Sequence, residues 1–279
     1  MTAARTVLII AALTLREASR RRVLAAVAVL TVALLALSGW GFSRLAAEST
    51  LTSGEARLAA SQLLNLVMFG FSLIAALGTA FLAGPTLSGE TESGIALAVL
   101  ARPVRRSAFL LGKWLGLAVF GSIFIVVAGL AECLVVLGTV DYWPPEPATA
   151  LALLAAQTIV LLTLSLLLST VISPMASGVV AVGLFGATWV AGVVGGIGVA
   201  LGNDGVERVG TVSRMLLPTD GLWRGAMHSF QDPVALAQAG PGFPFLSDAP
   251  LTATYLAWAA VWVAMVWGLA AASFLRKDL

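Results

Sequence analysis

The chain has 279 residues, of which 59% are hydrophobic and 11% are charged, and its mean hydropathy is +0.98. Soluble domains carry roughly 25% charged residues, so this composition excludes an ordinary soluble domain and predicts a polytopic membrane protein. The formal net charge of +2 gives no reason to expect a nucleic-acid partner. A single cysteine, Cys133, argues against an intramolecular disulfide or a cysteine-based metal site.

The first 22 residues combine a short apolar segment, TVLIIAALTL, with an arginine-rich one, REASRRR. The apolar segment is too short to cross a bilayer, so we expect residues 1–22 to form a helix in the cytoplasmic interface. The next apolar run, residues 23–41, is longer than the hydrophobic part of a signal peptide and is interpreted as an uncleaved span. Cleavage at LALSG, near the end of this run, is the alternative.

Six apolar runs are long enough to cross the roughly 30 Å hydrocarbon core of a bilayer. These predicted spans are residues 23–41, 63–87, 110–137, 151–172, 177–201 and 254–275. Six spans place both termini on one side, and that side receives 11 of the 16 Lys and Arg residues. The positive-inside rule therefore predicts that both termini are cytoplasmic. We expect the whole chain, 1–279, to form a single all-α membrane domain.

The loop between the second and third predicted spans, residues 88–110, is long and charged: SGETESGIALAVLARPVRRSAFL. Its apolar middle has acids before it and bases after it, which suits the dipole of a short helix that Pro103 ends. A short amphipathic helix on the cytoplasmic face is typical of a docking element for another protein. A solvated loop whose arginines only set the topology is the alternative.

Two features inside the spans are candidate sites. Glu132 is an acid within an apolar run, near its outer end, where a solvated or locally paired carboxylate competes with a functional one. The fifth span is rich in glycine, and two pairs spaced by four residues favour close helix packing, either within the chain or between subunits. These pairs are Gly192 with Gly196 and Gly198 with Gly202.

The segment 202–250 is too polar to span and is expected to be re-entrant or interfacial on the outer face. Four of its apolar residues share one helical face by their spacing: Trp223, Ala226, Met227 and Phe230. We predict a helix over residues 218–230 that lies on the outer leaflet and caps the pathway, with Asp220 as its N-cap. In this arrangement Asp220 and Arg224 stay in water. His228 has no second His or Cys nearby, so a metal site is not expected.

The charged loop carries an ordered pattern: Glu90-x-Glu92-x-Gly94, an apolar stretch, Arg102-Pro103-x-Arg105, and Gly112-Lys113 opening the next span. Together with LPTDGLWRGA at residues 217–226, this pattern resembles type-2 ABC exporter permeases, among them the nitrous-oxide-reductase maturation permease. The resemblance covers essentially the whole chain, because an N-terminal interfacial helix, six spans and a large outer segment between spans five and six also fit that family.

The resemblance implies a permease subunit that forms the translocation pathway as a dimer, with a second copy or a close paralogue. It implies that residues 88–106 hold the coupling helix that inserts into a separate ATPase, present in two copies. The coupling residues implied are Glu90, Glu92, Gly94, Arg102, Pro103, Arg105 and Arg106. The first and fifth spans would line the dimer seam, including Gly192, Gly196, Gly198 and Gly202. The predicted outer gate comprises Asp220, Trp223, Met227 and Phe230, and the expected location is the bacterial inner membrane.

ATP hydrolysis is not expected in this chain. A P-loop needs Gly-x4-Gly-Lys-Ser/Thr, whereas Gly112-Lys113 is followed by Trp114 and has Ser107 in place of the first glycine. We therefore expect no catalytic residue, metal or cofactor here, and ATP with Mg²⁺ in the partner subunit. An ion-coupled secondary transporter is the alternative, although midplane charges and matching broken helices are not evident. An intramembrane protease is disfavoured because the only histidine lies outside the spans.

Overall fold

The computed structural model describes residues 3–19, 22–47, 53–84, 105–232, 247 and 249–276. Within these ranges the regular elements are α-helices: α1 (Ala3–Ala18), α2 (Arg22–Ala46), α3 (Ser53–Gly84), α6 (Arg106–Val140), α7 (Pro147–Ser169), α8 (Pro174–Ala200), α9 (Asp204–Leu216), α10 (Thr219–Phe230) and α12 (Ala253–Leu275). Six of these are long and apolar enough to cross a membrane: α2, α3, α6, α7, α8 and α12. The predicted all-α architecture, with an N-terminal helix and six spans, is confirmed.

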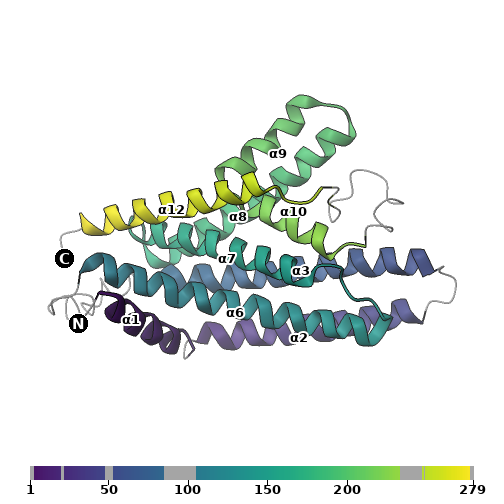
Figure 1. Cartoon of the computed structure of the whole chain (residues 1–279), viewed down its shortest axis with the longest axis horizontal. Coiled ribbons are helices and arrows are strands. Elements are labelled where there is room, and N and C mark those ends of the chain that lie inside the picture. The colour runs from purple at the N-terminus through teal and green to yellow at the C-terminus, as the bar shows by residue number, and fades with distance from the viewer. Residues whose placement is uncertain are drawn as a thin grey trace.

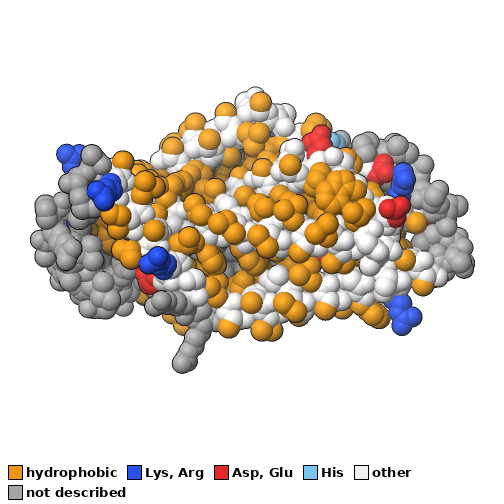
Figure 2. Space-filling model, turned by 60° about the horizontal axis from the view of Figure 1, so that its bottom comes forward, with side chains coloured by type: hydrophobic (Ala, Val, Ile, Leu, Met, Phe, Trp, Pro, Cys, Tyr) orange, Lys and Arg blue, Asp and Glu red, His pale blue; other side chains and the backbone are white. Residues whose placement is uncertain are grey.

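The spanning helices run along the long axis of the molecule, and both ends of the chain lie at the same end of it (Figure 1). We call this end the terminal end and the opposite one the far end. Figure 2 shows hydrophobic side chains over the middle of the molecule and charged side chains gathered toward its two ends. An apolar belt between charged ends is the surface that a bilayer requires.

Two spans are longer than hydropathy predicts. Helix α3 begins at Ser53, ten residues before the predicted span, because the polar stretch SGEARLAASQ is still helix-forming. With 32 and 35 residues, α3 and α6 are about 48 Å and about 52 Å long at 1.5 Å per residue. Both therefore extend beyond a hydrocarbon core of roughly 30 Å.

Helix α1 packs across the terminal end of α6 as well as exposing an apolar face. A Cβ on Gly112 of α6 would lie 2.7 Å from Ile10 Cβ, so only glycine permits this approach. Lys113, buried on α6, pairs with Glu17 of α1, with Nζ and Oε2 3.3 Å apart. The opposite face of α1 exposes Leu8 and Leu13, as a helix in the membrane interface would.

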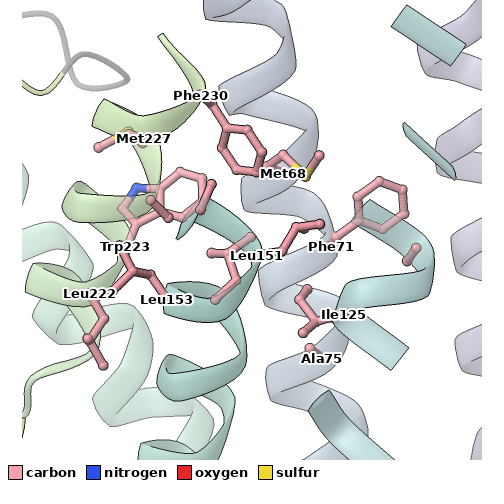
Figure 3. Close-up of a cluster of buried hydrophobic side chains, with 14 of the residues drawn as sticks. Met68, Phe71, Ala75, Ile125, Leu151, Leu153, Leu222, Trp223, Met227 and Phe230 are labelled. Atoms are coloured by element: carbon pink, nitrogen blue, oxygen red, sulfur yellow. The ribbon is translucent and has the colours of Figure 1, made fainter. Parts of the chain in front are cut away.

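The main apolar core lies where α3, α6, α7 and α10 meet. Figure 3 shows Trp223 and Phe230 of α10 pointing toward Met68 of α3 and Leu151 of α7. The α10 side chains Trp223, Met227 and Phe230 are at most 1% exposed, so α10 is an integral part of the bundle.

Candidate functional site

After α8 the chain turns back into the bundle. Gly202 has a φ of +64°, a left-handed conformation that suits glycine, and it reverses the chain between α8 and α9. Asn203 then caps α9, its Oδ1 accepting from the N–H groups of Gly205 and Val206 at 3.1 and 3.2 Å. Helix α9 returns along α8, and α10 leads back to the far end. Helices α9 and α10 therefore form a re-entrant pair, and we call Leu217 and Pro218, between them, the elbow.

Glycines on both helices allow α9 to lie directly against α8. A Cβ on Gly195 of α8 would lie 2.7 Å from the Cα of Gly210 on α9. A Cβ on Gly198 would meet the backbone N of Glu207. This close approach is the helix contact that small residues permit in membranes.

The elbow lies at membrane depth. Thr170 Oγ1 donates to Ser273 Oγ at 2.9 Å, which places the terminal ends of α7 and α12 level with each other. Trp262 of α12 and Gln157 of α7 hydrogen-bond to the residues on either side of the elbow. They lie about 16 and about 20 Å from that level at 1.5 Å per residue. Because the hydrocarbon core is roughly 30 Å thick, the elbow lies inside it.

The carbonyl groups at the end of α9 all have hydrogen-bond donors, as backbone in a hydrocarbon layer requires. The Ser213 carbonyl accepts from the backbone N–H of Leu217 at 3.0 Å. The next three carbonyls accept from side chains of α12: Tyr255 OH donates to Arg214 O at 3.0 Å, Trp258 Nε1 to Met215 O at 3.2 Å and Trp262 Nε1 to Leu216 O at 2.8 Å. Tyr255, Trp258 and Trp262 share one face of α12, and together they complete the helix end.

Polar side chains of neighbouring helices also form hydrogen bonds with Thr219, the first residue of α10. Gln157 Nε2 donates to Thr219 O at 3.2 Å, and Ser72 of α3 donates to Gln157 Oε1 at 2.6 Å. The hydroxyl groups of Thr188 on α8 and Thr219 are 3.0 Å apart. The elbow is thereby fixed from α3, α7 and α8.

A charged cluster lies beside the elbow. The Asp220 carboxylate, whose side chain is 1% exposed, accepts from two arginines through the same oxygen, Oδ2. Arg214 Nε donates at 2.9 Å and Arg224 Nε at 3.0 Å. Arg224 Nη2 also donates to the Gly192 carbonyl at 2.7 Å, which ties α10 to α8. We call Arg214, Asp220 and Arg224 the charged cluster.

Two glycines make room for this arrangement. A Cβ on Gly192 would collide with the Asp220 carboxylate, and a Cβ on Gly221 would collide with the Tyr255 phenol. The predicted dimer glycines thus have neighbours within the chain: Gly192 faces Asp220 and Gly198 faces α9. Among the described residues, a Cβ on Gly196 would have only the Arg224 guanidinium within 4 Å, and a Cβ on Gly202 would meet nothing. Their proposed role between subunits stays a prediction.

The predicted helix over residues 218–230 is confirmed as α10, but three details of it are wrong. Pro218 is the N-cap residue, and Asp220 lies in the first turn with its carboxylate on the arginines. Asp220 is also buried instead of lying in water, because its partners come from α9 and α10 at membrane depth. The predicted apolar face, including Trp223, packs against α3 and α7 and is not spread on a leaflet.

The far end of α10 is fastened to the loop between α6 and α7. Tyr142 OH donates to Phe230 O at 2.7 Å, and the Glu146 N–H donates to Ser229 O at 3.1 Å. Burial raises the pKa of Tyr142 above its usual range, with the Asp232 carboxylate adding to the shift. The phenol therefore stays protonated at neutral pH and remains a donor.

From residue 64 onward, helix α3 leaves one narrow strip partly uncovered between α2 and α8. Its members recur every three or four residues on one face, and we call them the α3 stripe: Leu66, Phe69, Leu73, Leu77 and Phe81. Toward the terminal end the stripe opens into a hollow of about 360 Å³ between α2, α3 and α8. The stripe is an apolar path about 22 Å long at 1.5 Å per residue.

Glu132 is fully buried in α6 and accepts a hydrogen bond from the Ser38 hydroxyl of α2. The structure thus favours the locally paired carboxylate over the solvated one. Glu132 Oε2 has no hydrogen-bond partner among the described residues. This acid joins α2 to α6 and lies apart from the charged cluster.

Most of the predicted coupling residues, Glu90, Glu92, Gly94, Arg102 and Pro103, lie outside the described residues. The remaining two, Arg105 and Arg106, lie at the terminal end of α6, and Arg106 Nη1 donates to the Leu275 carbonyl of α12 at 3.4 Å. The charged loop therefore joins the terminal ends of α3 and α6.

Sequence reasoning missed Arg214 and the hydrogen-bonding role of the α12 aromatics. Arg214 is separated from Asp220 by the elbow, so helical periodicity does not pair them. The spacing of Tyr255, Trp258 and Trp262 at i, i+3 and i+7 was the available signal, because polar-tipped aromatics on one face of a span indicate acceptors opposite them.

No curated protein is significantly similar to the chain in sequence. The sequence model described as "ABC-2 family transporter protein" matches residues 8–279, which includes all six spans, the charged loop and the re-entrant pair. The match does not extend to any particular member of the family, so similarity to the nitrous-oxide-reductase maturation permease stays a resemblance. With nearly its whole length matched and six helices able to span a membrane, the chain belongs to the ABC-2 transporter family.

Proposed function

We propose that the chain is the permease subunit of an ABC exporter and that a separate ATPase subunit drives it. The observation that carries this proposal is the family match over residues 8–279, on a chain whose six candidate spans fit a transporter membrane subunit. ATP and Mg²⁺ bind the partner, because the single Gly-Lys pair of this chain lies within the membrane helix α6 and lacks the P-loop pattern.

Coupling is assigned to residues 88–106. This loop connects the terminal ends of α3 and α6, so a force applied to it acts directly on the helix that carries the α3 stripe. Its acidic and basic ends, which include Glu90, Glu92 and Arg102, supply charges for a partner surface. The terminal end is then cytoplasmic, in agreement with the distribution of Lys and Arg, and the membrane is the bacterial inner membrane.

The pathway is assigned to the face that carries the α3 stripe, between two copies of the chain or between the chain and a paralogue. Helix α2 supports this assignment because it is the least buried of the six candidate spans. A span that is apolar all round and packs on one side only has surface left for a partner helix. The two copies would bring two ATPase subunits, one to each charged loop.

The test is charge reversal in the loop, with Glu90→Lys and Glu92→Lys combined. In proteoliposomes with the ATPase subunit, this variant should lose transport-coupled stimulation of ATP hydrolysis at least tenfold while still inserting as a folded permease. The matched control is Asp204→Lys with Glu207→Lys, the same charge change on the exposed first turn of α9. Equal stimulation of the loop variant and the wild type would refute coupling through this loop, and failure of any ATPase to associate would refute the exporter assignment.

A further inference from the structure

The charged cluster carries an excess positive charge at membrane depth. Two guanidinium groups share one carboxylate, and within the described part of the chain neither Arg214 nor Arg224 pairs with a second acid. An uncompensated charge in a hydrocarbon layer is unfavourable, and such residues usually face a cavity or a ligand. The excess charge therefore calls for an anion that the described residues do not supply.

Both arginines have donors available for that anion. A guanidinium carries five N–H groups, of which Arg214 uses Nε and Arg224 uses Nε and one Nη2 group in the contacts described above. Their side chains are 28% and 19% exposed, whereas Asp220 between them is 1% exposed. The cluster thus presents guanidinium groups outward and keeps its carboxylate inside.

An aromatic contact connects the charged cluster to the α3 stripe. The Phe69 ring of the stripe lies 4.8 Å from the Trp189 ring of α8 and 5.4 Å from the Trp223 ring of α10. Trp189 shares one face of α8 with Gly192 and Gly196, and Arg224 Nη2 reaches along that face to within 3.9 Å of a Cβ placed on Gly196. A charged site and an apolar path therefore adjoin.

We propose that the charged cluster binds the anionic headgroup of an amphiphile, a phosphate or a carboxylate, whose apolar part lies on the α3 stripe. Arginine suits this role because its planar fork binds such oxyanions in a bidentate fashion. A single anionic group would neutralise the excess charge that Asp220 leaves. This proposal rests on the proposed export function, since it names the chemical class of the cargo.

The experiment measures equilibrium binding of radiolabelled dodecyl phosphate to the full-length permease, purified in a nonionic detergent without any ATPase. Arg214→Gln and Arg224→Gln should each raise the dissociation constant at least tenfold, the usual effect of losing a charge-assisted hydrogen bond. Each variant leaves Asp220 one arginine, so the fold is retained. The control is Arg208→Gln, the same change on an exposed arginine of α9 outside the charged cluster.

Wild-type selectivity gives a second measurement that needs no variant. Dodecyltrimethylammonium, with the same tail and the opposite charge, should compete at least tenfold more weakly than unlabelled dodecyl phosphate. Inorganic phosphate should need at least hundredfold higher concentrations, because it lacks the tail. Equal binding of both amphiphiles, or unchanged binding in both Gln variants, would overturn the proposal, and equal potency of inorganic phosphate would overturn its amphiphile part. Because no ATPase is present, a failure of the coupling proposal leaves this result unaffected.

Discussion

At the residue scale, Gly192 leaves room for the Asp220 carboxylate because it has no side chain. The Asp220 carboxylate occupies the volume that any side chain at position 192 would need, and the Gly192 carbonyl binds Arg224 Nη2. A helix interior normally disfavours glycine by about 1 kcal/mol relative to alanine. Here the contact with a buried, doubly paired carboxylate reverses that preference, because adding a methyl group forces Asp220 away from its arginines.

We therefore expect Gly192→Ala to lower the melting temperature of the purified permease, since overpacking typically costs about 1–3 kcal/mol. Thermal unfolding in detergent, followed by tryptophan fluorescence, is the measurement. Gly183→Ala in the same helix is the control, because a Cβ at Gly183 meets nothing within 4 Å, and it should be neutral or stabilising. Equal melting temperatures for the two variants would contradict the assigned contact.

At the scale of elements, the re-entrant pair shows what the sequence can and cannot predict. Apolar periodicity correctly locates the spans, and the face that contains Trp223 correctly locates α10. Helix α9 is not predictable in this way, because DGVERVGTVSRML lacks the hydropathy of a span and its stability comes from close packing on the α8 glycines. Burial of Asp220 depends on Arg214, across a bend that no helical period describes.

Helix α12 determines whether the end of α9 can stay in the membrane. Trp262→Phe removes the donor to Leu216 O while keeping an aromatic ring, and we expect a loss of about 1–3 kcal/mol from the unsatisfied carbonyl. Hydrogen exchange of the α9 and α10 amides should become faster, together with a lower melting temperature.

Trp267→Phe in the same helix is the matched control. Trp267 Nε1 is buried and has no hydrogen-bond partner among the described residues, so its removal should leave stability unchanged or raised. If both variants destabilise equally, ring packing and not hydrogen bonding holds α9 in place.

At the scale of the whole molecule, the uneven covering of the spans indicates where the proposed second copy would pack. From residue 64 onward helix α3 is mostly buried and the α3 stripe is its most exposed part, whereas α2 beside it is largely exposed. A partner placed over this face would cover α2 and enclose the stripe. Side chains elsewhere on the surface, such as Val127 of α6, then face lipid.

We expect Leu73→Cys, in a Cys133→Ser background, to form a cross-link between copies in native membranes with a short bifunctional thiol reagent. Leu73 lies in the middle of the α3 stripe and is 38% exposed. Val127→Cys, on an exposed position of α6, should give none above background. Dimer bands on gels would be the readout, and cross-linking at Val127 alone would place the interface on the opposite face.

The aromatic donors of α12 also set an order of events during biogenesis. Leu216 and the Trp262 that completes its hydrogen bonding are 46 positions apart in the chain. At a synthesis rate of roughly 5–20 residues per second, Trp262 is added roughly 2–9 seconds after Leu216. During that interval the last carbonyls of α9 depend on water. We therefore expect the re-entrant pair to wait at the membrane surface and to enter the bilayer only once α12 has been inserted, so that the charged cluster is one of the last parts of the protein to assemble.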